Sequence, residues 1–277
     1  MKTILIATDF SPAALNAGNY AADMALVIKA NLVLLHTYLV PVSYAEVPVA
    51  VNILDILKDV ELRLTRIKAD LNERTGDRIK IETRVKAGTF FHELKTASEE
   101  IKPYAVVMGS QGTSATERFL FGGHTVHAMK YLDWPLITVP LEAHFSAVKK
   151  IGLACDFDKV VERIPVDEIT LLVNDFNASL HVLNTGKRTV YNPEIVFESG
   201  LLQEMIGSLK PEYHFITNES IDEGILEFVD ENNIDLLVVL PKRRSILNSL
   251  IHRSATKQFV LHSHVPVMAI HSHTFNH

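Results

Sequence analysis

Glycines at a regular spacing follow an apolar segment in the first half of the chain. Gly109 and Gly112 come directly after the apolar run 105–108, and the pair Gly122 and Gly123 follows after nine further residues. Glycine allows backbone N–H groups to approach a ligand closely, and N–H groups without a carbonyl partner can bind an anion. The spacing therefore indicates a phosphate site, whereas glycines taken alone could equally be turn residues.

An acidic residue, Asp9, follows the first apolar segment of the chain. Ligands of open α/β sheets bind beyond the carboxyl ends of the strands, at the point where the strand order reverses. If the order is 3-2-1-4-5, Asp9 lies beside Gly109 and can accept hydrogen bonds from a ribose or a base edge. The end of the second strand, at His36 and Thr37, would then border the base. Asp9 can also cap the helix that begins at Ser11, and this role is compatible with ligand binding.

The glycine pair 122–123 precedes a short helix that we expect over residues 125–132. The free N–H groups and the dipole at the start of a helix favour a phosphate group. The predicted helix start therefore adds a second anion-binding element next to the first glycines.

Apolar strand-like segments alternate with amphipathic helix-like segments through the first half. The predicted strands are 4–7, 32–38, 79–85, 105–108 and 136–139, and the predicted helices are 11–29, 52–74, 89–101 and 125–132. Such alternation predicts an α/β fold with a mostly parallel sheet and helices on both faces. The segment 79–85 alternates polar and apolar residues, which favours an edge strand.

The second half repeats the first with changes at the glycines. Residues 2–10 are similar to 149–157, residues 30–36 to 178–184, and the closing prolines Pro135 and Pro266 correspond. We therefore expect two tandem domains, at 1–142 and 148–271, each with five strands in the order 3-2-1-4-5. In the second copy residues 241–244, which read Pro-Lys-Arg-Arg, replace the glycine loop, and residues 252–254 stand at the expected helix start.

Composition excludes several classes of protein. The 277 residues are 47% hydrophobic and 22% charged, which suffices for two packed cores. The net charge of −6, from 27 basic and 33 acidic residues, argues against non-specific nucleic-acid binding. We expect no membrane span, because the longest apolar stretch falls short of about 20 residues. A single cysteine, Cys155, favours a buried inert thiol and a reducing compartment, so we expect a cytoplasmic protein.

These features together resemble the universal stress protein family over nearly the whole chain. The resemblance rests on Asp9 after the first strand, the Leu-Leu-His end of the second, and Gly-x-x-Gly-(nine residues)-Gly before Pro-Leu-Ile-Thr-Val-Pro. It implies the adenine nucleotide alpha hydrolase-like fold and a stress-response regulator that binds ATP, AMP or ADP, with Mg²⁺ as a further candidate. The nucleotide-binding residues implied are Asp9, Thr37, Gly109, Gly112, Gly122, Gly123, His124 and Thr125.

The resemblance leaves three functions open. The first is ATP binding in the N-terminal domain beside a degenerate second domain; Gly123 stands where the family usually has Ser or Thr. The second is a nucleotide-independent scaffold that binds an unidentified protein, with the fifth strands pairing between the halves as a pseudo-dimer; a homodimer is a further alternative. The third is an enzyme, which would at most hydrolyse ATP slowly, because no catalytic motif is evident.

Histidines near the C-terminus raise the question of a metal site. The triplet 271–273, His-Ser-His, could chelate a metal ion, but an incidental group of histidines in a terminal tail is the simpler interpretation. Neither a cysteine pair nor a suitable carboxylate spacing supports a structured metal site. We therefore predict none, and we assign no catalytic residue.

Overall fold

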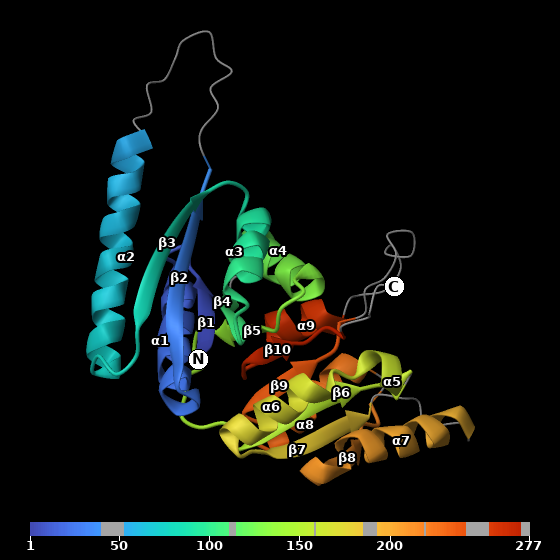
Figure 1. Cartoon of the computed structure of the whole chain (residues 1–277). Helices are drawn as coiled ribbons and strands as arrows, with labels where there is room; N and C mark the ends of the chain where they lie inside the picture. Colours follow the sequence, from blue (N-terminus) through green and yellow to red (C-terminus); the bar gives the residue numbers. More distant parts are fainter. Residues whose placement is uncertain are drawn as a thin grey trace.

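The computed structural model describes residues 1–39, 53–110, 115–157, 159–184, 193–218, 220–241 and 255–272. Its ten described strands form one sheet in the order β3-β2-β1-β4-β5-β10-β9-β6-β7-β8 (Figure 1). From its outer strand to the centre of the sheet, each half has the order 3-2-1-4-5, as the sequence predicts. The two halves meet at their fifth strands.

The elements of the first half follow the predicted alternation. They are β1 (Lys2–Ala7), α1 (Pro12–Ile28), β2 (Ala30–Tyr38), α2 (Ile53–Thr75), β3 (Ile81–Ala87), α3 (Phe90–Ile101), β4 (Ala105–Ser110), α4 (Ala115–Tyr131) and β5 (Leu136–Pro140). Pairing within this half is parallel throughout. The strand β3 lies at the edge of the sheet, as its alternating sequence indicates.

The second half repeats this plan, and most of its elements are shorter. They are β6 (Lys150–Cys155), α5 (Val160–Arg163), α6 (Val166–Phe176), β7 (Ser179–Asn184), α7 (Pro193–Ile206), η1 (Gly207–Leu209), β8 (Glu212–Phe215), α8 (Ile221–Glu231), β9 (Leu236–Val239), α9 (Ala255–His262) and β10 (Val267–Ala269). Its strands also pair in parallel with one another.

Two hydrophobic cores lie on opposite faces of the sheet. One core joins α1, α2, α5, α6 and α7 to one set of alternating strand residues, such as Ile4, Ile6 and Leu34. The other joins α3, α4, α8 and α9 to the intervening residues, such as Leu5 and Leu35. Figure 1 shows α2 on one side of the first three strands, with α3 and α4 on the other. The strands are therefore buried on both faces, which explains their continuous apolar sequences.

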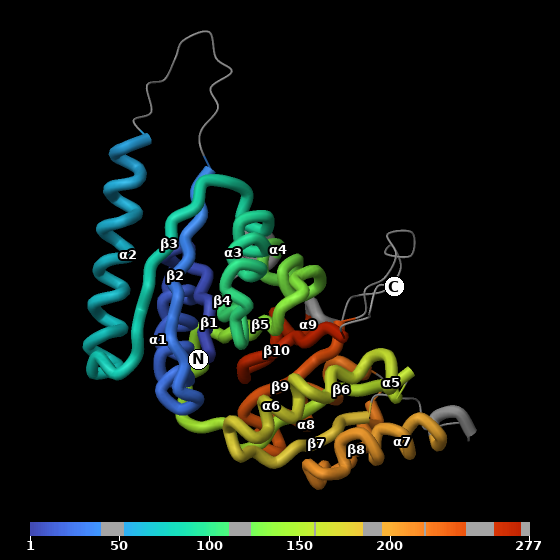
Figure 2. Tube along the Cα trace, viewed as in Figure 1, coloured from blue at the N-terminus to red at the C-terminus, as the bar shows by residue number. Residues whose placement is uncertain are grey.

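The junction between the halves is an antiparallel pair of strands. Thr138 of β5 lies opposite Val267 of β10, and Figure 2 shows the two strands side by side at the centre of the molecule. This pairing, which the sequence suggested for a pseudo-dimer, is confirmed. Because β10 occupies the outer edge of β5, that edge cannot also pair with a second chain; in the described sheet the outer strands are β3 and β8.

The segment that links the halves contacts both of them. The ring of Phe145 lies 5.2 Å from that of Tyr20 in α1 and 6.3 Å from that of Phe176 in α6. Asn16 of α1 donates two hydrogen bonds of 2.9 Å, to the carbonyls of Pro140 and Ala143. The link is therefore packed against both halves rather than acting as a simple spacer.

The helix α4 differs from the prediction. It begins at Ala115 rather than at residue 125, so the two glycines expected before the helix lie inside it. Paired glycines were interpreted as a break, but intrinsic propensity is a weak signal that neighbouring residues and tertiary packing override. Within the described part of the chain, no helix combines the length and apolar character needed to cross a membrane.

Candidate functional site

The ends of three neighbouring strands bring the first group of predicted residues together. Ala7 of β1 pairs with Leu35 of β2, and the backbone N–H of Thr8 donates to the Leu35 carbonyl at 2.9 Å. Two residues beyond the Ala7–Leu35 pair in this register, Asp9 lies level with Thr37. On its other side β1 pairs with β4, and continuing that register places Thr8 level with Gly109. Asp9, Thr37 and Gly109 thus meet at the predicted switch point, where the strand order reverses.

The carboxylate of Asp9 is exposed and has a local partner. Its Oδ1 atom accepts a hydrogen bond of 3.0 Å from the backbone N–H of Ser11. Ser11 Oγ in turn accepts from the N–H of Ala14 at 3.2 Å and caps α1. Asp9 therefore helps to shape the turn into α1, as one of the two interpretations predicts. An exposed carboxylate in this position can still accept hydrogen bonds from a ligand.

His36 is engaged in the structure of the strand ends. Its Nδ1–H donates to the carbonyl of Thr8 at 2.8 Å, and its ring stacks on Phe10 at a centroid distance of 4.3 Å. Phe10 has a φ of 67°, in the left-handed region that a bulky side chain rarely adopts. The guanidinium of Arg63 lies 5.6 Å from the Phe10 ring centroid. His36 therefore positions the turn after β1 rather than presenting itself to a ligand.

Gly109 is required by the packing of α1. A Cβ atom at this position would lie 2.6 Å from the carbonyl carbon and oxygen of Ala13 and 2.9 Å from the backbone nitrogen of Ala14. All three are backbone atoms, which cannot move without shifting the helix. The close approach that the glycine allows is thus an approach between β4 and the first turn of α1. The sequence predicted a close approach at Gly109, and the structure shows one to α1; a contact of Gly109 with a ligand stays a prediction.

The glycine pair lies inside a helix, whereas the sequence predicted that it precedes one. Gly122 and Gly123 lie in the interior of α4, where helical carbonyls occupy the backbone N–H groups, and Gly112 lies outside the described residues. His124 is exposed, with its ring 5.4 Å from that of Phe90. Thr125 is buried and its Oγ1 donates to the carbonyl of Gly109 at 3.4 Å. Thr125 therefore connects α4 to the end of β4.

The corresponding strand ends of the second half have a different environment. Asp156 is half-buried and is followed by Phe157, whose φ of 49° matches the turn at Phe10. Leu240 takes the place of Gly109, because Leu236 in β9 corresponds to Ala105 in β4. The helix after the turn is also broken, into α5 and α6, at Pro165. Residues 242–244 and 252–254 lie outside the described residues.

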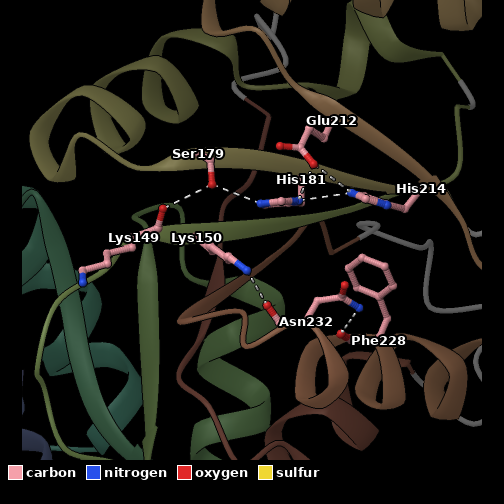
Figure 3. Close-up of polar contacts among 8 residues, drawn as sticks. All are labelled: Lys149, Lys150, Ser179, His181, Glu212, His214, Phe228 and Asn232. Carbon is pink, nitrogen blue, oxygen red and sulfur yellow. Dashed lines mark hydrogen bonds and ion pairs between the residues drawn. The ribbon is translucent and has the colours of Figure 1, made fainter.

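A second cluster of chemically capable side chains lies in the second half, and sequence reasoning missed it. His181, Glu212 and His214 bring one ligand atom each to within 4.8 Å of one another (Figure 3). Burial lowers the pKa of His181 below its ordinary value, with smaller contributions from Lys150 and His214, while Glu212 opposes the shift. The available signal was the spacing Glu212-Tyr213-His214, which places the two outer residues on one face of a strand.

His271 and the cysteine are both buried in the structure. His271 is buried, and its Nε2–H donates to the carbonyl of Met129 in α4 at 3.0 Å. Assigning this residue to an incidental tail was therefore wrong, while His273 and His277 lie outside the described residues. Cys155 is buried, as predicted.

Comparison with known proteins agrees with this architecture. The model of the universal stress protein family matches residues 1–140 and 202–271. The chain belongs to the universal stress protein family. The two matched segments fall in the two halves of the sheet, as the repeat indicates. The comparison with curated protein sequences found no match.

Solved structures support the same fold. A universal stress protein from Archaeoglobus fulgidus DSM 4304 is similar over 98% of this chain and 96% of its own, with 17% identity and a TM-score of 0.71. A protein of unknown function from Pseudomonas aeruginosa PAO1 is similar over 98% and 93%, with 11% identity and a TM-score of 0.59. A third structure, a universal stress protein in complex with cAMP, aligns with 50% of this chain and over 96% of its own length, with 24% identity and a TM-score of 0.39. At these identities the first two show the fold alone.

Proposed function

We propose that the first half of this universal stress protein binds ATP or a related adenine nucleotide at the carboxyl ends of β1, β2 and β4. The observation that supports this most is the register that sets Asp9, Thr37 and Gly109 side by side where the strand order reverses. In this position Asp9 would accept hydrogen bonds from the ribose hydroxyls, and Thr37 would border the base. Asp9 is also the carboxylate that would contact Mg²⁺ if the nucleotide carries one.

The phosphate groups of the nucleotide fit the site only if α4 begins later in the sequence than Ala115, where it begins in the structure. Helical N–H groups at Gly122 and Gly123 are occupied, whereas an anion needs them free. Each glycine lowers the stability of a helix interior by about 1 kcal/mol relative to alanine, so unwinding the turns before Thr125 costs comparatively little. We therefore propose that the phosphates bind as the start of α4 unwinds toward Thr125, which would free the amides of the glycine pair.

This mode of binding would connect the nucleotide to the second half. The helix α4 packs against α9, and the His271 ring bonds to the Met129 carbonyl near the end of α4. Unwinding the start of α4 would shorten the helix that makes these contacts, and we propose that the nucleotide acts on the second half through this helix. This route gives the nucleotide a regulatory effect without any chemical step.

Isothermal titration of the full chain with ATP tests the site. The matched variants are Asp9→Ala and Asp156→Ala, because the two aspartates hold equivalent positions in the halves. We expect Asp9→Ala to weaken binding about tenfold, since a hydrogen bond to a charged group contributes about 1.5–3 kcal/mol, and Asp156→Ala to leave it unchanged. Absence of heat at millimolar ATP, or equal losses in both variants, would contradict the proposal.

A scaffold function independent of nucleotide is the second candidate. It is supported by the single ten-stranded sheet, which makes the two halves one continuous structural unit. Its test is whether a protein partner associates equally with the unchanged chain and with Asp9→Ala, with and without ATP. Association that depends on ATP in the unchanged chain alone would favour the nucleotide-regulated function.

A further inference from the structure

One group of side chains lies well away from the proposed nucleotide site. His181 is the third residue of β7, and Glu212 and His214 are the first and third residues of β8. In the register of these parallel strands His181 lies opposite Glu212. The cluster therefore sits toward the amino ends of the strands, whereas the nucleotide crevice is at the carboxyl ends of the first half. Figure 3 shows the three side chains pointing toward one another.

The distances within the cluster are those of a metal site. His181 Nδ1 lies 3.1 Å from His214 Nε2 and 3.7 Å from Glu212 Oε2, and the remaining edge, from His214 Nε2 to Glu212 Oε2, is 4.0 Å. Ligand bonds of about 2.0–2.2 Å at tetrahedral angles place the ligand atoms of a zinc ion about 3.3–3.5 Å apart. One of the three observed distances is shorter than this range and two are longer. A cation could therefore enter after side-chain shifts of about half an ångström.

Hydrogen bonds orient His181 for such a role. Ser179 Oγ lies 3.3 Å from the Lys149 carbonyl, to which it donates, and 3.0 Å from His181 Nε2. With its own hydrogen used in this way, Ser179 Oγ accepts from Nε2–H, and the lone pair of Nδ1 points into the cluster. A serine that holds the outer nitrogen of a histidine is the kind of partner that orients metal ligands in proteins.

His214 completes the donor set. Its ring packs on Phe228 of α8 at a centroid distance of 4.7 Å, and without a cation its Nε2–H would donate to His181 Nδ1. A neutral imidazole can carry its proton on Nδ1 instead, which releases Nε2 as a ligand. The side chains of His181, His214 and Glu212 are 9%, 28% and 63% exposed, so a fourth position would open to solvent.

We propose that His181, Glu212 and His214 bind a divalent transition-metal ion, zinc in the first instance, with a water molecule as the fourth ligand. Two imidazoles and one carboxylate suit zinc, whereas Mg²⁺ prefers oxygen ligands. Lys150 is a cation beside the cluster, and its Nζ is bound to the Asn232 carbonyl at 2.9 Å. Its charge opposes a second cation, so we expect moderate affinity rather than the affinity of a closed structural site.

The first half supplies a matched control. At the positions of His181, Glu212 and His214 in the repeat it has Val33, Glu82 and Arg84, and Val33 pairs with Glu82 as His181 pairs with Glu212. The two histidine ligands are therefore absent from this region of the first half. We expect Glu82→Gln to leave metal binding unchanged, whereas Glu212→Gln removes a ligand.

Isothermal titration of the full chain with Zn²⁺, and separately with Mg²⁺, tests the proposal. We expect one Zn²⁺ per chain and no Mg²⁺ at this site. His214→Ala should weaken Zn²⁺ binding about 100-fold, and Ser179→Ala about tenfold, since loss of an outer partner costs about 10–100-fold. Glu212→Gln, which changes an exposed side chain, serves if His214→Ala does not fold. Because Glu212 is a direct ligand, its loss should weaken binding at least as much as the loss of an outer partner, about tenfold or more.

A second variant separates this site from the terminal histidines. The double change His273→Ala with His277→Ala should retain the Zn²⁺ stoichiometry and affinity. Loss of binding in that variant, no Zn²⁺ binding by the unchanged chain, or equal affinities for the unchanged chain and Glu212→Gln would overturn the proposal.

Discussion

The two halves share a backbone plan but differ at the strand ends where a ligand would bind. Three residues other than glycine adopt left-handed φ values, between 49° and 67°, at equivalent positions of each half: Phe10 and Phe157, Lys29 and Asn177, Lys102 and Asn233. The turns are therefore preserved through the repeat. The first half has Gly109 at the end of β4 and one continuous helix α1, whereas the second has Leu240 and the broken helix α5–α6.

One close backbone contact belongs to this difference. At Gly109 the backbone of α1 approaches β4 so closely that no side chain fits between them. A leucine in the same position of the second half is incompatible with that approach, and the first turn of the helix there is separated from the rest at Pro165. The comparison teaches that a glycine of a ligand motif can also fix the packing of the helix that frames the site.

The largest effect is expected from adding a side chain where β4 contacts α1 in the first half. Gly109→Ala places a Cβ against the Ala13 backbone, and we expect the free energy of unfolding to fall by about 3 kcal/mol, at the upper end for overpacking. Leu240→Ala, which trims a half-buried side chain, should cost about 1 kcal/mol, less than a fully buried leucine. Urea denaturation measures both. An unchanged stability in Gly109→Ala would show that the helix tolerates displacement.

A smaller effect is expected at the starts of the two helices. Ser11 Oγ caps α1, whereas Lys159 precedes α5 without a side-chain capping bond. We expect Ser11→Ala to lower the free energy of unfolding by about 1 kcal/mol and Lys159→Ala to change it by less than about 0.5 kcal/mol. Thermal and urea denaturation measure both variants. If Ser11→Ala and Lys159→Ala lower the free energy of unfolding equally, the residues at the helix starts do not distinguish the halves.

The smallest effect concerns the glycine pair inside α4. Beyond its chain neighbours and the nearby backbone of α4 itself, no atom lies within 4 Å of the space that a Cβ at Gly123 would occupy, so Gly123→Ala should stabilise the helix by about 0.5–1 kcal/mol. If nucleotide binding requires this part of α4 to unwind, the same change should weaken ATP binding severalfold. Gly200→Ala in α7, where space is also open, is the control for stability without an effect on ATP. Stabilisation with unchanged ATP affinity would mean that α4 stays helical when the nucleotide binds.

The sequence was most informative where local pattern and topology agree. Alternating segments predicted the elements of the first half, and the repeat predicted their order in the second. It was wrong at α4, where Gly122 and Gly123 were interpreted as the residues before a helix, because glycine weakens a helix without necessarily ending it. It also missed the His181 cluster, since the pairing of β7 with β8 brings together residues about thirty positions apart.

The sequence by itself determined the duplication, the alternation of strands and helices, and the position of Asp9 at the end of a buried strand. Local residue patterns carry this information, because apolar periodicity and turn residues act over a few neighbouring positions. The tertiary structure decided what Gly109 contacts, that His271 bonds to Met129, and that His181, Glu212 and His214 meet. Those contacts depend on strand register and helix placement, which set distances between residues remote in the chain.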